Sequence, residues 1–235
     1  AAPARSMPPT SKTAFPVLLL AAVLFSAGPS PVRAASVTGG ALNHPGEKSH
    51  NIGIGWPESF YVFEPLVQEK SALGLRVGVQ AWPLAISLGV QGRFTIKEQG
   101  MVSLALLIAP SFNIAGFGGS RATYPKNFNF GRSRTFLASM GPGVNIGLLA
   151  SVAIRPKVSI LATLENPVAL WLWATAPPSW WLEWPILVSG GVEFEASYNA
   201  SFFGRVGGGP ALAFTGPNAL LGFHWHIHVG VQIRK

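Results

Sequence analysis

The chain has 235 residues, enough for one domain with a sizeable core, and only 11% of them are charged, against about 25% in an average protein. It contains no cysteine, which excludes disulfides and thiolate chemistry. All 9 acidic residues are glutamates, which counts against calcium loops and aspartate-based catalytic triads. The 27 glycines and 8 tryptophans, together with the low charge, favour a membrane-facing β-structure over a cytosolic enzyme.

The first residues have the features of an export signal. Lys12 precedes the apolar run 14–27, and the small-residue stretch 32–35 follows it. An apolar run of about 14 residues is short for a spanning helix, so we expect residues 1–34 to be a cleaved signal peptide. An exported chain does not meet nucleic acid in its normal work. Removing residues 1–34 takes away Arg5, Lys12 and Arg33, which lowers the net charge from +8 to +5 (8 − 3). We assign this excess of basic residues to pairing with anionic lipid head groups and lumenal glutamates, not to a nucleic-acid partner.

The next part of the chain is irregular. Residues 35–50 are polar and rich in glycine, which predicts a mobile segment. Residues 51–64 are more apolar but are broken by Trp56-Pro57, and they fit a short strand, a periplasmic segment or a plug inside a barrel. We treat 35–70 together as a periplasmic N-terminal segment or partial plug, and 71–235 as the main domain.

From residue 71 onwards, apolar residues alternate with polar or small ones, as expected of strands with one apolar face. The last such stretch, 221–235, places Phe223, Trp225 and Ile227 on one face and three histidines on the other. Its apolar face continues for about 11 residues, the length of a tilted strand that crosses a bilayer, whereas strands of soluble proteins usually have about 5–6 residues. Eight stretches of this kind are separated by connections at 83–85, 97–100, 115–142, 155–157, 166–185, 198–200 and 215–218.

The lengths of these connections are sorted. The second, fourth and sixth are short, while both long ones, 115–142 and 166–185, fall in the other set. Outer-membrane barrels have short periplasmic turns, longer external loops and an even number of strands. Helical spans at 101–115 and 171–188 are disfavoured, because prolines interrupt both and the period is two residues. A soluble exported sandwich or barrel remains the competing fold.

The export signal, the alternating strands and the sorted loops resemble the small eight-stranded outer-membrane β-barrels of Gram-negative bacteria. The resemblance covers 71–235 and is one of pattern, without a diagnostic short motif. It implies an all-β fold: a closed antiparallel up-and-down transmembrane β-barrel of about eight strands, with short periplasmic turns and two long external loops. It also implies a monomer in the outer membrane, in contact with outer-membrane lipids and inserted by the outer-membrane assembly machinery.

The inward face of this predicted barrel carries a polar network. Its members are Arg76, Arg93, Glu165, Glu193, Glu195, Arg205, His224, His226 and His228. Buried charges must pair, and a narrow barrel is filled by its side chains, so we expect a structural core of ion pairs and neutral histidines. A polar path for a small solute or protons, a metal shared by two histidines and a glutamate, and a lipid-modifying enzyme that uses His and Glu are the alternatives.

Two further groups are expected near the external end. Six tryptophans suit an interfacial aromatic girdle, because indole has an apolar body and a polar N–H: Trp171, Trp173, Trp180, Trp181, Trp184 and Trp225. Basic residues of the first long loop suit lipopolysaccharide phosphates: Arg121, Lys126, Arg132 and Arg134. We predict no cofactor, no metal and no catalytic residues, and a structural or surface-binding role through the external loops. A narrow channel or hydrophobic-solute carrier is the remaining alternative.

Overall fold

The computed structural model describes residues 37–81, 84–115, 139–173, 179–215 and 218–235. The predicted signal peptide 1–34 and the basic loop residues Arg121, Lys126, Arg132 and Arg134 lie outside these ranges. None of the described residues form a helix long and apolar enough to cross a membrane.

The described part of the chain forms eleven β-strands. They are β1 (Ser49–Trp56), β2 (Glu58–Val67), β3 (Ser71–Ala81), β4 (Leu84–Gln99), β5 (Val102–Ala115), β6 (Ser139–Arg155), β7 (Val158–Trp173), β8 (Ser179–Pro185), β9 (Leu187–Ser197), β10 (Ala200–Thr215) and β11 (Asn218–Arg234).

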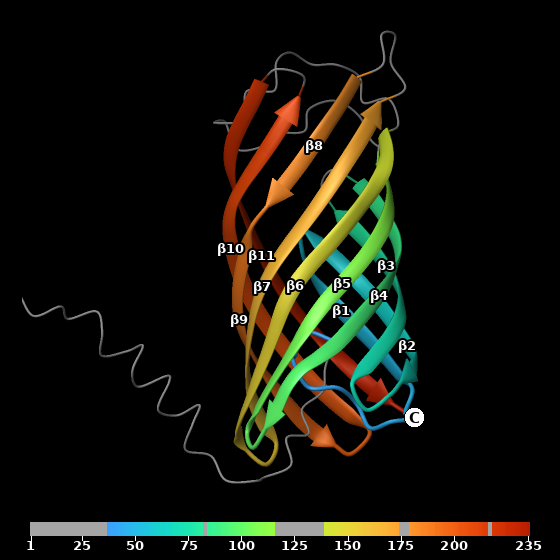
Figure 1. Ribbon diagram of the computed structural model, residues 1–235, viewed down its shortest axis with the longest axis vertical. Coiled ribbons are helices and arrows are strands. Elements are labelled where there is room, and N and C mark those ends of the chain that lie inside the picture. Colours follow the sequence, from blue (N-terminus) through green and yellow to red (C-terminus); the bar gives the residue numbers. More distant parts are fainter. Residues whose placement is uncertain (1–36, 82–83, 116–138, 174–178, 216–217) are drawn as a thin grey trace, which may run out of the picture.

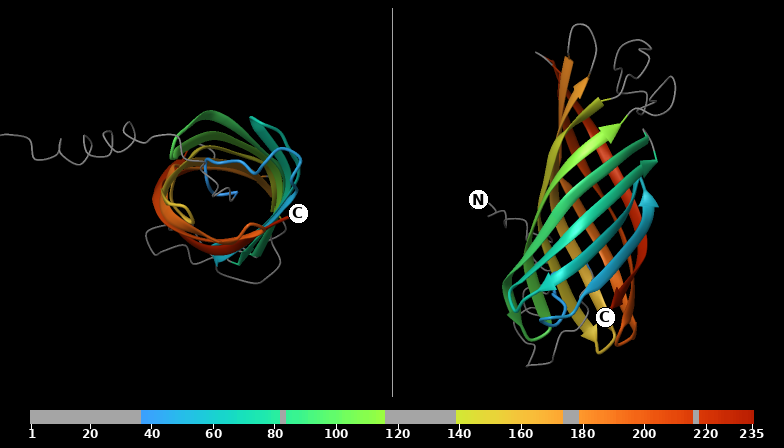
Figure 2. Two further views of the ribbon diagram at one scale, coloured as in Figure 1. Left: turned by 90° about the horizontal axis from the view of Figure 1, so that it is seen from below. Right: turned by 90° about the vertical axis from the view of Figure 1, so that its right-hand side faces the viewer.

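These strands close into an antiparallel barrel, as Figure 2 shows from below. Each pairs with its neighbour in the sequence, except that β8 and β9 do not pair with each other and instead both pair with β7 and β10. β11 pairs with both β10 and β1, from Ser49 opposite Arg234 to Trp56 opposite Ile227. Ten strands, β1–β7 and β9–β11, form the ring. The eleventh, β8, lies beyond β9 and pairs with the upper ends of β7 and β10. The prediction of a closed all-β barrel is confirmed.

The predicted number of eight strands is wrong. The segment left open in the sequence, 51–64, belongs to β1 and β2, which form a hairpin around Trp56-Pro57 and add two strands before residue 71. The alternation was hidden because the inward face of β2 is itself apolar, with Phe60 and Val62 buried inside while Tyr61 is exposed outside.

The second predicted long loop is also corrected. Residues 166–173 complete β7 and residues 179–185 form β8, so most of 166–185 is strand. Tryptophan and proline dominate this segment, and they obscured an alternation that runs in phase from β8 into β9. Glu183 and Ser189 lie on the inner face, and Trp184 and Val188 on the outer face.

The two ends of the barrel differ. The C-terminal end of β11 and the turns β2–β3, β4–β5, β6–β7 and β9–β10 lie at the lower end in Figure 1. On one side of the barrel, β7, β8, β10 and β11 extend further towards the upper end than β1–β4 do (Figure 1). The wall is therefore taller on that side.

The outer surface is apolar along its length. Large hydrophobic side chains predicted to face outward are exposed, such as Leu75 (56%) and Val79 (44%) on β3, and Phe223 (63%) and Val229 (59%) on β11. Residues between them point inward and are buried or half-buried. The predicted alternation of faces is confirmed along these two strands.

Inside the barrel, two aromatic rings lie against glycines. Phe203 on β10 is opposite Gly230 on β11, which is opposite Gly53 on β1, which is opposite Phe60 on β2. The two rings stack with centroids 6.3 Å apart. A Cβ on either glycine would meet ring atoms, so both must be glycine for the rings to lie flat on the wall. With Val37, Val62 and Leu161, these rings form an apolar cluster inside the barrel.

Gly230→Ala is therefore expected to destabilise the barrel by about 1–3 kcal/mol, because the new methyl group would overlap the Phe203 ring and the Ile52 carbonyl oxygen. Gly204→Ala is the matched control, since the nearest atom to its Cβ would be 3.9 Å away. Urea unfolding in detergent micelles measures both changes. Equal midpoints for the two variants would contradict the packing argument.

Candidate functional site in the barrel lumen

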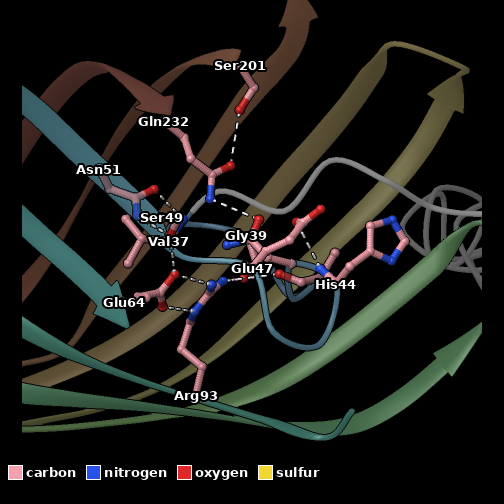
Figure 3. Close-up of polar contacts among 12 residues, drawn as sticks. Val37, Gly39, His44, Glu47, Ser49, Asn51, Glu64, Arg93, Ser201 and Gln232 are labelled. Carbon is pink, nitrogen blue, oxygen red and sulfur yellow. Dashed lines mark hydrogen bonds and ion pairs between the residues drawn. The ribbon is translucent and has the colours of Figure 1, made fainter. Parts of the chain in front are cut away.

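A segment of the chain before β1 lies inside the lower lumen. Residues 37–43 cross the ring (Figures 2 and 3), and Val37, Thr38, Ala41 and Asn43 are buried. We call residues 37–43 the plug. Side chains from four different strands bind it: Asn51 of β1, Arg93 of β4, Ser151 of β6 and Gln232 of β11.

The plug is bound largely through its backbone. The Ser151 hydroxyl accepts hydrogen bonds from the Gly40 N–H (2.7 Å) and the Ala41 N–H (3.2 Å). Arg93 Nη1 donates to the carbonyl oxygens of Gly39 (3.3 Å) and Ala41 (3.1 Å). A Cβ on Gly40 would overlap the carbonyl groups of Ser103 and Leu149, so the plug approaches the wall closely there. The wall supplies partners for backbone groups that would otherwise be buried without hydrogen bonds.

A fully buried ion pair supports the plug. Arg93 Nε and Nη2 donate to Glu64 Oε1 (2.9 Å) and Oε2 (2.8 Å), and both side chains have 0% exposure (Figure 3). The Ser49 hydroxyl also donates to Glu64 Oε2, at 2.9 Å. Bidentate geometry and additional hydrogen bonds are what a buried pair needs to offset the cost of desolvation.

Two of the predicted carboxylates, Glu193 and Glu195, lie on β9. Glu193 accepts a hydrogen bond from the Ser201 hydroxyl (2.7 Å), which also approaches Gln232 Oε1. Glu195 Oε1 lies 3.7 Å from Arg234 Nη1 near the lower rim. These contacts place Glu193 and Glu195 in the group around the plug.

Above the plug, the lumen holds a cavity of about 230 Å³. Two ion pairs line it: Arg76 with Glu58, at 3.1 Å, and Arg205 with Glu165. The Arg76 guanidinium also lies 4.8 Å from the centre of the Phe60 ring. The opposite wall is uncharged and consists of small, hydroxyl and amide residues of β4–β6, including Ser87, Ser111, Asn113 and Asn145.

The three histidines of β11 line the same cavity. His228 Nε2 is 3.0 Å from the Glu58 carbonyl oxygen, and His224 Nε2 is 3.0 Å from Glu183 Oε1. The His226 and His228 rings are 5.3 Å apart. Among the residues that the structure describes, no three His or Glu side chains converge in a way that would hold a metal ion.

The predicted network is thus divided into two groups. Arg93, Glu193 and Glu195 surround the plug, whereas Arg76, Glu165, Arg205 and the histidines line the cavity. Four partners were missed by the sequence analysis: Glu58, Glu64, Glu183 and Arg234. Glu58 and Glu64 lie on the unrecognised β2, and Glu183 was assigned to a loop. The one available signal was their spacing, because Glu58, Phe60, Val62 and Glu64 follow at every second residue.

The tryptophans do not all lie on one face. Trp180 (44%), Trp184 (42%) and Trp225 (55%) are exposed on the outer surface, where Trp225 lies beside Trp56 with ring centres 6.3 Å apart. Trp181 is 8% exposed and lies on the inner face of β8, in phase with Glu183, so the interfacial position predicted for it is corrected. Trp171, opposite Trp181 across the β7–β8 pair, lines the cavity. The side chain of Trp173 lies outside the described residues.

Comparison with solved structures finds matches to this chain at low sequence identity. The attachment invasion locus protein Ail of Yersinia pestis is 10% identical, with a TM-score of 0.38 over 81% of this chain and 99% of that one. The outer membrane protease OmpT of Escherichia coli is 7% identical, with a TM-score of 0.39 over 81% and 94%. The KdgM porin, solved in complex with disordered oligogalacturonate, is 8% identical, with a TM-score of 0.34 over 80% and 98%.

No protein-family model matches the chain, and no curated protein does.

Proposed function

We propose that this protein is an outer-membrane β-barrel whose lumen is closed by its own N-terminal segment, and that it has a structural or binding role and does not conduct. The observation that carries this proposal is the plug. Four wall strands bind it, and the fully buried Arg93–Glu64 pair holds its carbonyl groups. A wide aqueous path past such a network would expose charges that are now fully enclosed.

The outer surface supports the membrane location. The strands β4–β7, β10 and β11 have 14 to 17 residues, more than the roughly 9–11 that a tilted strand needs to cross a bilayer. Exposed Leu, Ile, Val, Phe and Trp side chains cover the outside of the wall. Soluble monomers rarely expose apolar patches larger than a few hundred Å². Lipid is the environment that suits this surface.

The same geometry opposes the enzyme alternative. A lipid-modifying enzyme needs its histidine within reach of an acyl chain on the outside of the wall. His226 and His228 are each 5% exposed and face the lumen, where His228 contacts Glu58. A hydrophobic-solute carrier is opposed by the ion pairs that line the cavity, since an apolar ligand would desolvate them. The proposal is therefore a binding or structural role.

Fractionation and electrical recording test this proposal. We expect the protein to sediment with outer membranes, to migrate differently on gels with and without heating, and to produce no conductance steps in planar bilayers. Conductance of the intact protein would refute the closed lumen. Recovery only in the soluble periplasmic fraction would refute the membrane location.

A further inference from the structure

We infer that the cavity above the plug is a binding site for an uncharged polyhydroxy solute about the size of one sugar ring. This inference rests on the proposed function in one respect: the lumen is closed below the cavity, so a solute enters from the upper end and stays there. The site consists of side chains from both the charged and the uncharged walls of the lumen.

Each charged side chain of the cavity already has a partner, and for Glu183 this partner is His224, whose Nε2 lies 3.0 Å from Glu183 Oε1. Arg76 is bound to Glu58 by two hydrogen bonds of 3.1 and 3.2 Å, and Arg205 is bound to Glu165. Glu165 also accepts from Asn145 Nδ2 (2.8 Å) and from the Thr163 hydroxyl (3.2 Å). An anionic ligand would have to compete with these carboxylates for the guanidinium groups, and a cationic ligand would have to compete with the guanidinium groups for the carboxylates. Either charge is therefore disfavoured.

Several buried polar atoms of the cavity lack a partner among the described residues. They are His226 Nε2, His228 Nδ1, Arg205 Nε and Asn145 Oδ1. His226 is 5% exposed, so its unpartnered nitrogen is removed from bulk water. Buried polar groups are nearly always hydrogen-bonded, so a small turn of these side chains towards a bound solute would give the atoms the partners they lack.

A hydroxyl group matches this set. Arg205 Nε can only donate and Asn145 Oδ1 can only accept, while each imidazole donates at one nitrogen and accepts at the other. A hydroxyl both donates and accepts, so a ring with several hydroxyls satisfies donors and acceptors on different walls together. The two ion pairs and the His224–Glu183 contact can all stay in place when such a solute binds.

The size and the walls agree with such a solute. The cavity of about 230 Å³ is below the roughly 300–1,000 Å³ of sites for drug-sized ligands. Trp171 lines it and offers an apolar ring face with a polar N–H, which suits the C–H face of a sugar. Ser87, Ser111 and Asn113 supply further hydroxyl and amide groups on the opposite wall.

Calorimetric titration of the detergent-solubilised full chain tests this inference. The neutral probes are D-glucose, D-galactose, D-mannose and myo-inositol. Three comparison ligands have other chemistry: D-galacturonate is anionic, D-glucosamine is cationic and cyclohexanol is mainly apolar. We expect saturable binding of at least one neutral probe, tighter than that of every charged or apolar probe. Tighter binding of a charged probe or of cyclohexanol, or no saturable binding of any neutral probe, would overturn the inference.

Two variants connect the binding to the cavity. His226→Phe removes the unpartnered nitrogen and is expected to weaken binding by about two- to tenfold, the effect of one hydrogen bond. Ser103→Ala removes a buried, unpartnered hydroxyl of the lower lumen, beside the plug, and is expected to leave binding unchanged. Equal effects of the two variants would contradict the site. Heat-modifiable migration checks that each variant is folded.

These measurements are made in detergent and do not depend on membrane location or conductance. A protein that conducts ions but binds a neutral sugar would refute the closed lumen and still support the sugar site. A protein that shows no conductance and binds none of the neutral probes would agree with the closed lumen but refute the sugar site.

Discussion

Arg93→Met is expected to lower the free energy of unfolding by about 3–5 kcal/mol, the cost of leaving one partner of a buried ion pair without the other. Arg93 and Glu64 are both at 0% exposure, so the remaining carboxylate has no water to solvate it. The substitution also removes the donor to the carbonyl oxygens of Gly39 and Ala41. Urea unfolding in detergent micelles, followed by tryptophan fluorescence, measures the change.

Two comparisons define the cause of this loss. Arg76→Met breaks the pair with Glu58, whose side chains are 19% and 29% exposed, so solvent screens it and a much smaller loss is expected. The double variant Arg93→Met, Glu64→Leu removes both charges and is expected to recover most of the stability, because an apolar pair has no unpaired charge. Similar losses for Arg93→Met and Arg76→Met would show that burial of the pair is not the source.

Deleting residues 37–43 is expected to turn a barrel that does not conduct into one that passes ions and small sugars. These residues lie across the lower lumen, and four wall strands hold them there. Their removal leaves a polar wall of Ser49, Asn51, Ser151 and Gln232 that water can solvate. Planar-bilayer recording should show discrete conductance steps, and liposomes should swell in sugar solutions.

The control for this deletion keeps the length of the segment. Replacing residues 37–43 by a glycine–serine sequence of equal length preserves the connection but removes the side chains of Val37 and Asn43. We expect intermittent conductance from this variant, because a flexible segment has no reason to stay in one position. A deletion variant as silent as the intact protein would show that the plug does not close the lumen.

The side chains that face outward could be predicted from the sequence, whereas many of those that face the lumen could not. On β3 and β11 the environment outside is uniformly apolar, so alternation alone assigns residues such as Leu75 and Phe223 to the outside. The lumen accepts both apolar and charged residues, since Phe60 and Glu64 share the inner face of β2. A strand with apolar residues on both faces has no period-two signal, and for this reason β2 was not recognised. The alternation of β1 is present but short, because Trp56-Pro57 ends it.

For the candidate site, the sequence could predict which residues face the lumen but not which of them pair. The sequence placed Arg205, Glu165 and the β11 histidines on one polar face, and all of them line the cavity. Their partners depend on strand register and on the curvature of the closed ring, which connect residues as far apart as Glu58 and His228. For 35–70 the sequence left open a periplasmic segment or a partial plug. It did not indicate which residues enter the lumen, because Gly39, Gly40 and Ala41 are bound through backbone groups that every residue has.

The contacts of the plug also constrain the order in which the barrel assembles. The segment precedes every strand of the described residues, yet Asn43 is bound by Gln232 on β11, 189 residues further along the chain. Because β11 closes the ring by pairing with β1, a segment outside the ring at that moment would have to enter through a sealed wall or a narrow end. We therefore expect the plug to lie against β1, β4 and β6 before β11 pairs with β1 and closes the ring. Contacts of such long sequence separation are slow to form, so ring closure around the plug is the step at which we expect folding to be slowest.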